Sequence, residues 1–298
     1  MVQLIFKKSM HSPDHVVTII IGKRSNLSHN LFERFNNAEV FSSEGLLQSL
    51  LELRKFSEKK VNIIFNNFQP STQLNSFVHP TKYIDLSISL TVKVLMYLIE
   101  NGALINQIIY TSSCSVYGEL VMQSDYNKTA PKGIPSSLKY LNEQILREVC
   151  SNFGLKLTIA RLFNIFGGDD NFSVISKIYN CYINKTKLNI FNEGKSERDY
   201  IHVKNIVDIY EKILFEPTLR FDTIDIGCGE GKSLAGILKD LSIKGYNIAT
   251  KSANRNEIHT SQANINNIKK IIDISLFIDV NTYLLNKLNG TDTITKKY

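Results

Sequence analysis

The chain has 298 residues, of which 43% are hydrophobic and 21% charged, and its formal net charge is +7. These values are typical of a globular protein with one large domain, or one domain and a smaller lobe. No apolar run approaches the roughly 18 residues that cross a bilayer. The apolar start of the chain is too short for a secretory signal. We therefore expect a cytoplasmic protein with no membrane partner.

The positive charge does not indicate a nucleic-acid partner. The lysines are scattered, and much of the excess lies at the two ends, at Lys7, Lys8, Lys296 and Lys297. No basic helix or basic strip with interleaved aromatic residues is present. A mild positive field suits a phosphate-bearing small substrate. The four cysteines lack the spacing of a metal site, so we expect free thiols and no metal.

In chain order, short apolar runs alternate with amphipathic segments over the first 160 residues. Buried strands are predicted at residues 16–21, 38–42, 61–65, 105–111 and 157–162. Helices are predicted from Ser28 onward and over residues 44–59, 81–101 and 136–153. This alternation predicts an α/β fold with a doubly wound, Rossmann-like parallel sheet.

The remainder of the chain is less regular and predicts a smaller C-terminal lobe. Helices are expected at residues 173–184, 204–215, 232–242 and about 276–288, and strands at 187–191 and 221–226. We place the domain boundary between residues 165 and 166, and we expect residues 200–230 to pack back on the first domain.

The turn after the first strand predicts a cofactor site. A dinucleotide needs a tight turn there, so that backbone N–H groups and the helix dipole meet its pyrophosphate. The turn reads Gly-Lys-Arg-Ser-Asn-Leu-Ser over residues 22–28. Its place favours cofactor binding over the alternative, an ordinary turn capped by serine. The cofactor-binding candidates are Gly22, Arg24, Ser25, Asn26 and Leu27.

Several stretches resemble the extended short-chain dehydrogenase/reductase family, whose members act on nucleotide sugars with NAD or NADP. Besides the turn, they are Tyr83–Ser87, Thr111–Gly118, Lys139–Glu143, Arg161–Gly167 and Gly194–Val203. The resemblance covers nearly the whole chain. It implies that residues 1–165 bind the dinucleotide and that residues 166–298 form the substrate lobe. The family motif has glycine where this chain has Ser25 and Ser28.

The resemblance also implies roles for single residues. Ser113 would orient the sugar, and Lys139 would hold the nicotinamide ribose, so these two are the catalytic candidates. Asn67 and Lys139 join the cofactor-binding candidates, and Ser115, Asn164 and Arg198 would bind the substrate.

The chain departs from the family at one critical place. Pro135 stands where the family has its catalytic tyrosine, and Ser87 replaces a frequent asparagine. Tyr117, Ser113 or a bound water is expected to relay the proton instead. We expect three other residues to have structural roles: Arg161 packs inside the fold, Asp199 stabilises a corner, and His202 is buried and hydrogen-bonded.

The cofactor is predicted to be NADP rather than NAD. Arg24 lies in the turn, and the second strand ends in Phe41-Ser42-Ser43 without an acid. A 2′-phosphate favours a basic residue with no acid opposite.

We therefore expect an NAD(P)-dependent reductase of a 4-keto-6-deoxy sugar nucleotide, in the synthesis of a surface polysaccharide such as O-antigen. The alternatives are a nucleotide-sugar 4-epimerase, or a degenerate relative that binds nucleotide sugar without chemistry. A homodimer is expected through helices 81–101 and 136–153, whose surplus apolar residues are Leu86, Leu90, Leu138, Tyr140 and Ile145.

Overall fold

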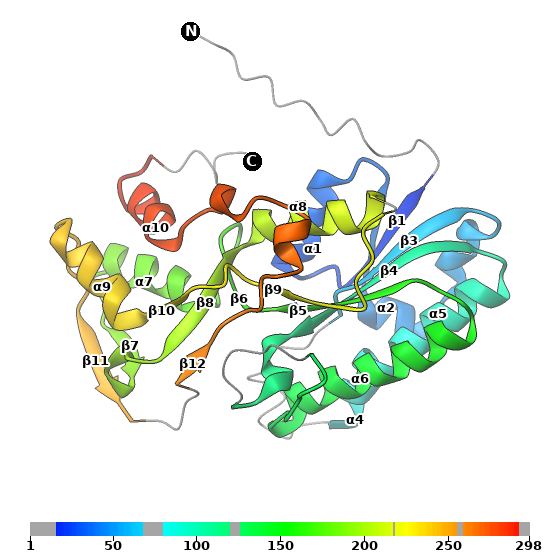
Figure 1. Cartoon of the computed structure of the whole chain (residues 1–298), viewed down its shortest axis with the longest axis horizontal. Coiled ribbons are helices and arrows are strands. Elements are labelled where there is room, and N and C mark those ends of the chain that lie inside the picture. Colours follow the sequence, from blue (N-terminus) through cyan, green and yellow to red (C-terminus); the bar gives the residue numbers. More distant parts are fainter. Residues whose placement is uncertain (1–15, 68–79, 120–125, 217, 255–258, 292–298) are drawn as a thin grey trace, which may run out of the picture. The chain divides into compact units, whose positions relative to one another are not determined.

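The computed structural model describes residues 16–67, 80–119, 126–216, 218–254 and 259–291. Six strands hydrogen-bond into one sheet in the order β2-β1-β3-β4-β5-β9 (Figure 1). They are β1 (Val17–Ile21), β2 (Ala38–Phe41), β3 (Lys60–Phe65), β4 (Leu104–Ser113), β5 (Leu157–Leu162) and β9 (Thr223–Ile226). The pairings β1–β2, β1–β3 and β3–β4 are parallel. The predicted α/β fold with a Rossmann-like parallel sheet is confirmed.

The chain divides into two compact units. The first unit comprises Met1–Thr111, Gly133–Ile159 and Tyr210–Asp222, and the second comprises Ser112–Lys132, Ala160–Ile209 and Thr223–Tyr298. Residues 210–222 belong to the first unit although they come late in the chain. The predicted domain limits, 1–165 and 166–298, stay a prediction.

The helices of the first unit differ from the predicted ones at two places. They are α1 (Asn26–Arg34), α2 (Ser43–Gln48), the 3-10 helix η1 (Leu51–Phe56), α4 (Pro80–Ile84), the π-helix η2 (Asp85–Ser89), α5 (Leu90–Glu100) and α6 (Gly133–Asn152). Helix α1 begins at Asn26 and not at Ser28, because Ser25 caps it. The single helix predicted over residues 44–59 is wrong, because Ser49 has an extended backbone that separates α2 from η1.

One face of the sheet packs on α5 and α6 to form the main core. Ile19, Ile63, Ile108 and Ile159 come from four successive strands of the sheet and belong to this cluster. The cluster also includes leucines on α5 and Leu146 on α6. Helices α5 and α6 lie side by side (Figure 1). The burial of this face accounts for the continuous apolar runs of the strands.

Part of the predicted dimer surface lies in this interior and not on the outside. Leu86 and Leu90 are 1% and 0% exposed. Their side chains fill the monomer, so their assignment to a dimer interface is wrong. Leu138, Tyr140 and Ile145 on α6 are half-buried. The most exposed apolar side chains in this region are Leu141 on α6 and Ile84 at the end of α4.

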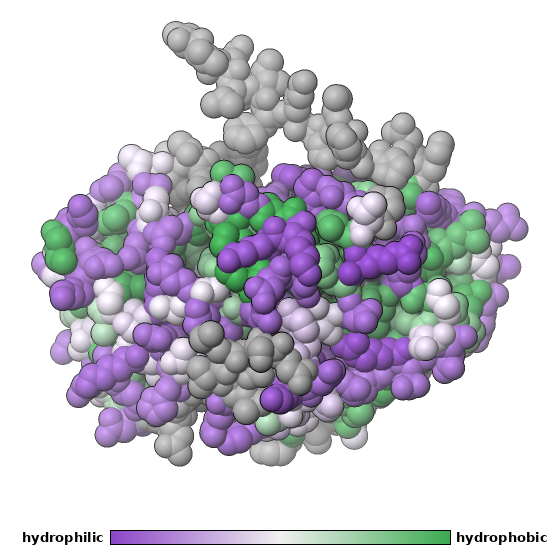
Figure 2. All heavy atoms as spheres, viewed as in Figure 1, coloured by the Kyte–Doolittle hydropathy of each residue, from purple (hydrophilic) through white to green (hydrophobic). Residues whose placement is uncertain are grey.

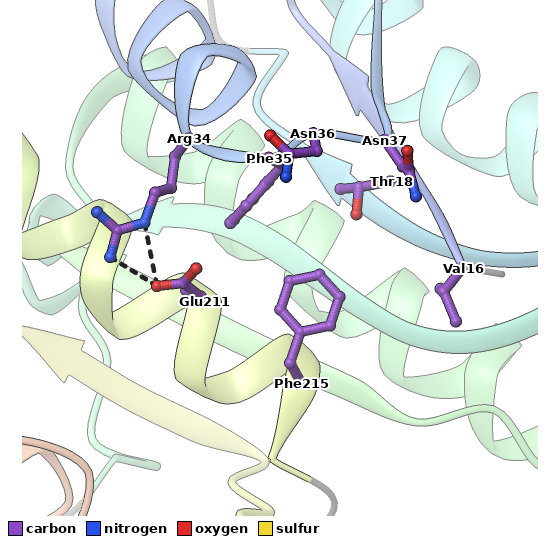
Figure 3. Close-up of a pocket in the computed structure, with 8 residues that line it drawn as sticks. All are labelled: Val16, Thr18, Arg34, Phe35, Asn36, Asn37, Glu211 and Phe215. Carbon is purple, nitrogen blue, oxygen red and sulfur yellow. Dashed lines mark hydrogen bonds and ion pairs between the residues drawn. The ribbon is translucent and has the colours of Figure 1, made fainter. Parts of the chain in front are cut away.

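The end of α8 (Val203–Phe215) lies near the start of β1 and the end of α1, where Thr18, Phe35 and Phe215 line one small hollow. Arg34 at the end of α1 donates from Nε and Nη2 to Oε2 of Glu211, over 3.1 and 2.7 Å (Figure 3). The rings of Phe35 and Phe215 meet edge to face at 5.7 Å. These contacts fix the last turns of α8 to the first unit.

The second unit has its own small sheet and core. Strand β8 (Glu197–His202) pairs with β10 (Gly231–Ser233), β12 (Thr260–Ser261) and β6 (Asn164–Phe166). Strand β7 (Leu188–Phe191) pairs with β11 (Thr250–Ala253). Helices α7 (Val174–Ile183), α9 (Leu234–Ile243) and α10 (Val280–Leu288) contribute to a second apolar cluster. Strands β6, β8, β10, β11 and β12 were not predicted.

In the described part of the chain, no helix combines the length and apolar character that crossing a membrane requires. Hydrophilic residues cover much of the face seen in Figure 2, with smaller apolar areas between them.

Candidate active site

The turn after β1 is built for close approach of backbone to backbone. Gly22 has a φ of +118°, and a Cβ there would collide with the carbonyl oxygen of Asn66. The N–H groups of Gly22 and Lys23 both donate to the carbonyl of Phe41, at 3.0 and 3.1 Å. Only glycine combines this conformation with this contact. The first glycine of the predicted motif is therefore required by the fold.

The two serines that replace glycine form a structure of their own. Ser25 Oγ accepts a hydrogen bond from the N–H of Ser28 at 3.1 Å and caps α1. Nδ2 of Asn66 then donates to Oγ of Ser25 at 2.6 Å and to Oγ of Ser28 at 2.7 Å. Sequence reasoning missed Asn66, which follows β3 and reaches the turn across about 40 residues of chain.

This arrangement fits a dinucleotide pyrophosphate. The Ser25 hydroxyl accepts two hydrogen bonds, so its own hydrogen can be donated to a phosphate oxygen. The first turn of α1 carries no acidic residue that would repel an anion. Asn66 is 1% exposed, and its Oδ1 has no partner among the described residues. A buried polar atom of this kind is expected to meet a water or a ligand.

Arg24 has an acidic neighbour, contrary to the sequence-based premise for NADP. Its Nη2 lies 3.1 Å from Oε2 of Glu44, and Lys82 Nζ lies 3.2 Å from Oε1 of the same carboxylate. Lys82 and Arg24 lower the pKa of Glu44. Glu44 lies in the first turn of α2, three residues past the end of β2. The premise that no acid stands opposite Arg24 is wrong, because the chain folds Glu44 back onto the turn.

Lys139 lies on α6 with its ammonium against the end of β4. Nζ donates to the carbonyl of Thr111 at 2.7 Å and lies 5.1 Å from the ring centre of Tyr110. Burial lowers the pKa of Lys139 to about 7, and the nearby Glu143 carboxylate opposes the shift. Lysine in this setting can exchange a proton near neutral pH.

A π-turn, η2, packs on α6, the helix that carries this lysine. The Ser87 carbonyl in η2 accepts from Nδ2 of Asn142 at 3.2 Å, from Nδ2 of Asn67 at 3.3 Å and from the Thr91 hydroxyl. Asn67 also donates to the carbonyl of Leu86 at 2.9 Å. Its side chain is thus directed at the helix, and only its unpartnered Oδ1 remains to contact a cofactor. π-Turns are frequent at functional sites.

Pro135 occupies the first turn of α6, one turn before Lys139. Proline is well accommodated there because the first N–H groups of a helix have no partner within it. It supplies no proton, so the usual phenol of this position has no equivalent at residue 135.

Ser113 and Ser115 belong to the second unit. Ser113 ends β4 and caps the 3-10 helix η3 (Cys114–Tyr117), with its Oγ accepting from the N–H of Ser115 at 3.2 Å. A serine hydroxyl that accepts one hydrogen bond still has its own hydrogen to donate, for example to a substrate oxygen. The structure therefore holds Ser113 in a fixed orientation by its cap.

Tyr117 is hydrogen-bonded to a carboxylate. Its hydroxyl donates to Oδ1 of Asp225 at 2.6 Å, and the Arg161 guanidinium lies 4.8 Å over its ring. Burial and Asp225 raise the pKa of Tyr117. Burial also raises the pKa of Asp225 to about 6. Arg161 is buried, as predicted, and donates to the carbonyl of Tyr126 at 2.8 Å.

The predicted substrate residues Asn164 and Arg198 lie on neighbouring strands of the second unit. Asn164 on β6 is in register with Tyr200 on β8, two residues after Arg198. Because side chains alternate along a strand, Asn164 and Arg198 are on the same face. Asn164 Nδ2 donates to the carbonyl of Asp199 at 3.0 Å, and Arg198 Nη1 to that of Glu197 at 2.8 Å.

Two polar residues of β8 have structural roles, as predicted. The Asp199 carboxylate accepts from the N–H groups of Cys228, Gly229 and Ala263, at 2.6, 2.8 and 3.1 Å. His202 is fully buried, and its Nδ1 accepts from the N–H of Lys204 at 3.1 Å. Among the described residues, no group of three histidine, cysteine or acidic side chains could hold a metal ion.

The sequence of this chain is similar to those of known proteins. Residues 12–227 match the model of a family described as the NAD dependent epimerase/dehydratase family. A dTDP-D-glucose 4,6-dehydratase of Dictyostelium discoideum is 24% identical over 237 residues, which cover 74% of this chain and 50% of the relative. An uncharacterized UDP-glucose epimerase of Bacillus subtilis (strain 168), YtcB, is 25% identical over 141 residues, 47% of this chain and 44% of the relative. The chain spans about half the length of these relatives.

Solved structures show the same fold. The NAD-dependent NDP-hexosamine 5,6-dehydratase TunA of tunicamycin biosynthesis superposes with a TM-score of 0.77 at 18% identity, over 92% of this chain and 97% of its own. UDP-glucuronic acid 4-epimerase from Bacillus cereus, in complex with UDP-glucuronic acid and NAD, has a TM-score of 0.76 at 16% identity, over 93% and 99% of the two chains.

Proposed function

Because the chain belongs to the NAD dependent epimerase/dehydratase family, we propose that it binds NAD and epimerises a nucleotide sugar at C4. The observation that carries an enzymatic role is Lys139, whose Nζ is held on the carbonyl of Thr111, in the strand that ends at Ser113. The choice of epimerase over reductase rests on Glu44, which neutralises the arginine that favoured NADP.

The dinucleotide would bind to the first unit. Gly22, Ser25 and the start of α1 would hold the pyrophosphate, and Lys139 would hold the nicotinamide ribose. Arg24, Asn26 and Leu27 would complete the turn, with Asn67 beside it. Bound there, the cofactor would supply the acceptance and return of a hydride.

The proton of the reaction needs a carrier other than a phenol. Pro135 has none to give, and the Tyr117 hydroxyl is bound to Asp225. We propose that Lys139 takes this part, since its pKa of about 7 leaves it in both protonation states near neutrality. The neutral amine would accept the proton of the sugar hydroxyl and later return it. Ser113 would orient that hydroxyl, with Ser115 as a second donor.

The nucleotide sugar would bind to the second unit through its diphosphate. Arg198 and Asn164 share one face of adjacent strands, and we propose that they hold the diphosphate of the nucleotide sugar. A guanidinium fork matches phosphate oxygens, and an amide adds a neutral donor beside it.

The test is incubation of the purified protein with NAD⁺ and a panel of UDP- and dTDP-sugars, with ¹H NMR detection of C4 epimers. We expect Lys139→Ala to abolish turnover and Ser113→Ala to lower kcat by about 10²-fold or more. Intact turnover in both variants would mean that the catalytic residues lie elsewhere. Pro135→Tyr is expected to raise kcat, because proline is replaceable in a first turn.

A reductase of a 4-keto-6-deoxy sugar nucleotide is the second candidate, for surface-polysaccharide synthesis. The short connection between β2 and β3, which holds only α2 and η1, favours it. Oxidation of NADPH by a 4-keto sugar nucleotide, without formation of epimers, would support it.

A protein that binds nucleotide sugar without catalysis is the third candidate, because Pro135 replaces the catalytic tyrosine of the family. It would be supported by nucleotide-sugar binding with neither turnover nor dinucleotide binding.

We further propose that the protein works in the cytoplasm as a homodimer. The dimer would form through half-exposed apolar side chains of α4, η2 and α6, at Ile84, Ile88, Leu138, Leu141 and Ile145. Leu141 and Ile84 are 49% and 44% exposed. Covering such adjacent apolar stripes is a common reason for helices to pair between subunits.

A further inference from the structure

The first unit contains a cavity at the edge of the sheet where β3, β4 and β5 begin. Its volume is about 100 Å³, and its walls come from the strand starts and from the end of α8. Lys60 begins β3, Lys156 precedes β5, and Arg220 follows α8. Asn66 and the cofactor turn lie at the opposite ends of these strands. The cavity is therefore separate from the candidate active site.

The cavity is lined by cations without counterions. In the part of the chain that the structure describes, Lys60, Lys156 and Arg220 form no ion pair with a carboxylate. The one acidic lining residue, Glu216, is paired with Lys212 one turn earlier on α8. Three unneutralised cations around one hollow produce a local positive potential that favours an anion.

A buried amide next to the cavity supports this. Asn62 is 0% exposed, and its Nδ2 has no partner among the described residues. Asn62 is in register with Thr18 on one side and Gln107 on the other. Gln107 and Asn106 line the cavity, and Asn106 Nδ2 donates to Oδ1 of Asn62 at 2.8 Å. Thr18 lines the small hollow of Figure 3.

An asparagine in this place is costly for the fold. Its neighbours along β3 are Val61, Ile63 and Ile64, all fully buried. A buried amide N–H group without a partner destabilises the fold relative to a paired one. Such a group is commonly satisfied by an ordered water or a bound ligand.

We propose that this cavity binds a phosphate group. Two lysines and one arginine, all with exposed side chains, supply positive charge for a phosphate dianion, and a guanidinium can bind two of its oxygens. A volume of about 100 Å³ admits one tetrahedral oxyanion with a few waters. The Nδ2 of Asn62 would reach the anion through one of these waters. The ligand is inorganic phosphate or the phosphate end of a phosphorylated metabolite.

The test uses the full-length protein and inorganic phosphate, with isothermal titration calorimetry in buffers of matched ionic strength. The double variant Lys156→Gln/Arg220→Gln is expected to raise the Kd for phosphate about tenfold or more. Lys59→Gln, which removes the same charge from a neighbouring residue outside the cavity, is expected to leave the Kd unchanged. Asn62→Val is expected to weaken phosphate binding while raising the melting temperature.

A further variant separates this cavity from the proposed diphosphate site. Arg198→Gln is expected to leave phosphate binding intact, whatever its effect on a nucleotide sugar. Tighter binding of glycerol phosphate than of inorganic phosphate would identify a phosphorylated metabolite as the ligand, and the reverse would identify free phosphate. Absence of binding, equal loss in Lys59→Gln, or loss in Arg198→Gln alone would each overturn the proposal.

Discussion

The amide nitrogen of Asn66 lies 2.6 Å from Oγ of Ser25, so the end of β3 holds the cap of α1. The same nitrogen donates to Oγ of Ser28 at 2.7 Å. Both serines stand where the family motif has glycine. Asn66 therefore links the two serines that stand in place of glycine. Side-chain hydrogen bonds hold this turn, whereas a turn with glycines would be held by its backbone alone.

We predict that Asn66→Ala weakens both the fold and cofactor binding. Loss of two hydrogen bonds to partly buried hydroxyls is expected to lower the free energy of unfolding by about 1–3 kcal/mol. The Kd for NADH, measured by fluorescence titration, should rise as the cap loosens. Ser28→Ala is the control, because it keeps the Asn66–Ser25 bond and should leave the Kd unchanged. An equal loss of affinity in both variants would contradict this role for Ser25.

Glu44 is predicted to set the cofactor preference. The unmodified protein should bind NADH more tightly than NADPH, because Glu44 engages Arg24 and Lys82 and repels a 2′-phosphate. Glu44→Gln frees both cations and should shift the ratio of the two Kd values toward NADPH by about tenfold. Glu39→Gln removes an acid of β2 that pairs with Lys55 of η1 and serves as the control. A preference for NADPH in the unmodified protein would disprove this role of Glu44.

Lys139 is predicted to make stability rise with pH. Its pKa of about 7 in the folded protein lies below the ordinary 10.5. Between these values the unfolded chain binds the proton and the folded chain does not, so unfolding becomes less favourable as pH rises. Below pH 7 both states are protonated, and the cost of the buried charge is fully present.

The measurement is the free energy of unfolding of the unmodified protein and of Lys139→Met from pH 6 to 10. Across this range, the free energy of unfolding of the unmodified protein should rise by at least about 1 kcal/mol more than that of the variant. If the free energies of unfolding of the two proteins change in parallel with pH, the ammonium group of Lys139 is not desolvated in the folded state. If Lys139 carries the reaction proton, the profile of kcat/KM should also bend near pH 7.

Tyr117 is predicted to support the fold without entering the chemistry. Tyr117→Phe leaves Oδ1 of Asp225 without its donor and should lower the free energy of unfolding by about 1–3 kcal/mol. Epimer formation should keep its kcat within about twofold, since the phenol is bound to the carboxylate. A fall of about 10²-fold, the usual size of general-acid loss, would instead identify Tyr117 as the proton carrier.

The dimer is predicted to depend on the exposed apolar side chains of α4, η2 and α6. Leu141→Glu places a charge on this surface and should convert the dimer to a monomer, as measured by light scattering. Its thermal stability at low concentration should be unchanged, because Leu141 is half-exposed in the monomer. Ile243→Glu, at a more exposed isoleucine on α9, should remain a dimer. A monomeric unmodified protein at micromolar concentration would refute the interface.

The sequence predicted the α/β fold because buried parallel strands are continuous apolar runs, as at residues 17–21 and 61–65. It also predicted the buried places of Arg161 and His202. It did not predict Asn66 or Glu44 at the turn, because each reaches the turn through the tertiary fold and leaves no local pattern. Leu86 and Leu90 were misplaced for a related reason. A helical apolar stripe does not reveal which side meets the core when both sides carry leucine.

The π-turn at Asp85–Ser89 has a consequence for the helix faces on its two sides. A π-turn behaves as one residue inserted into an α-helix, so the segments on its two sides are out of phase by about 100°, one residue's rotation. Removal of one residue here would restore an unbroken helix and withdraw the Ser87 carbonyl from Asn67 and Asn142. It would also turn Ile84 away from the line of Ile88. The π-turn thus decides which residues before and after Asp85–Ser89 share a helix face.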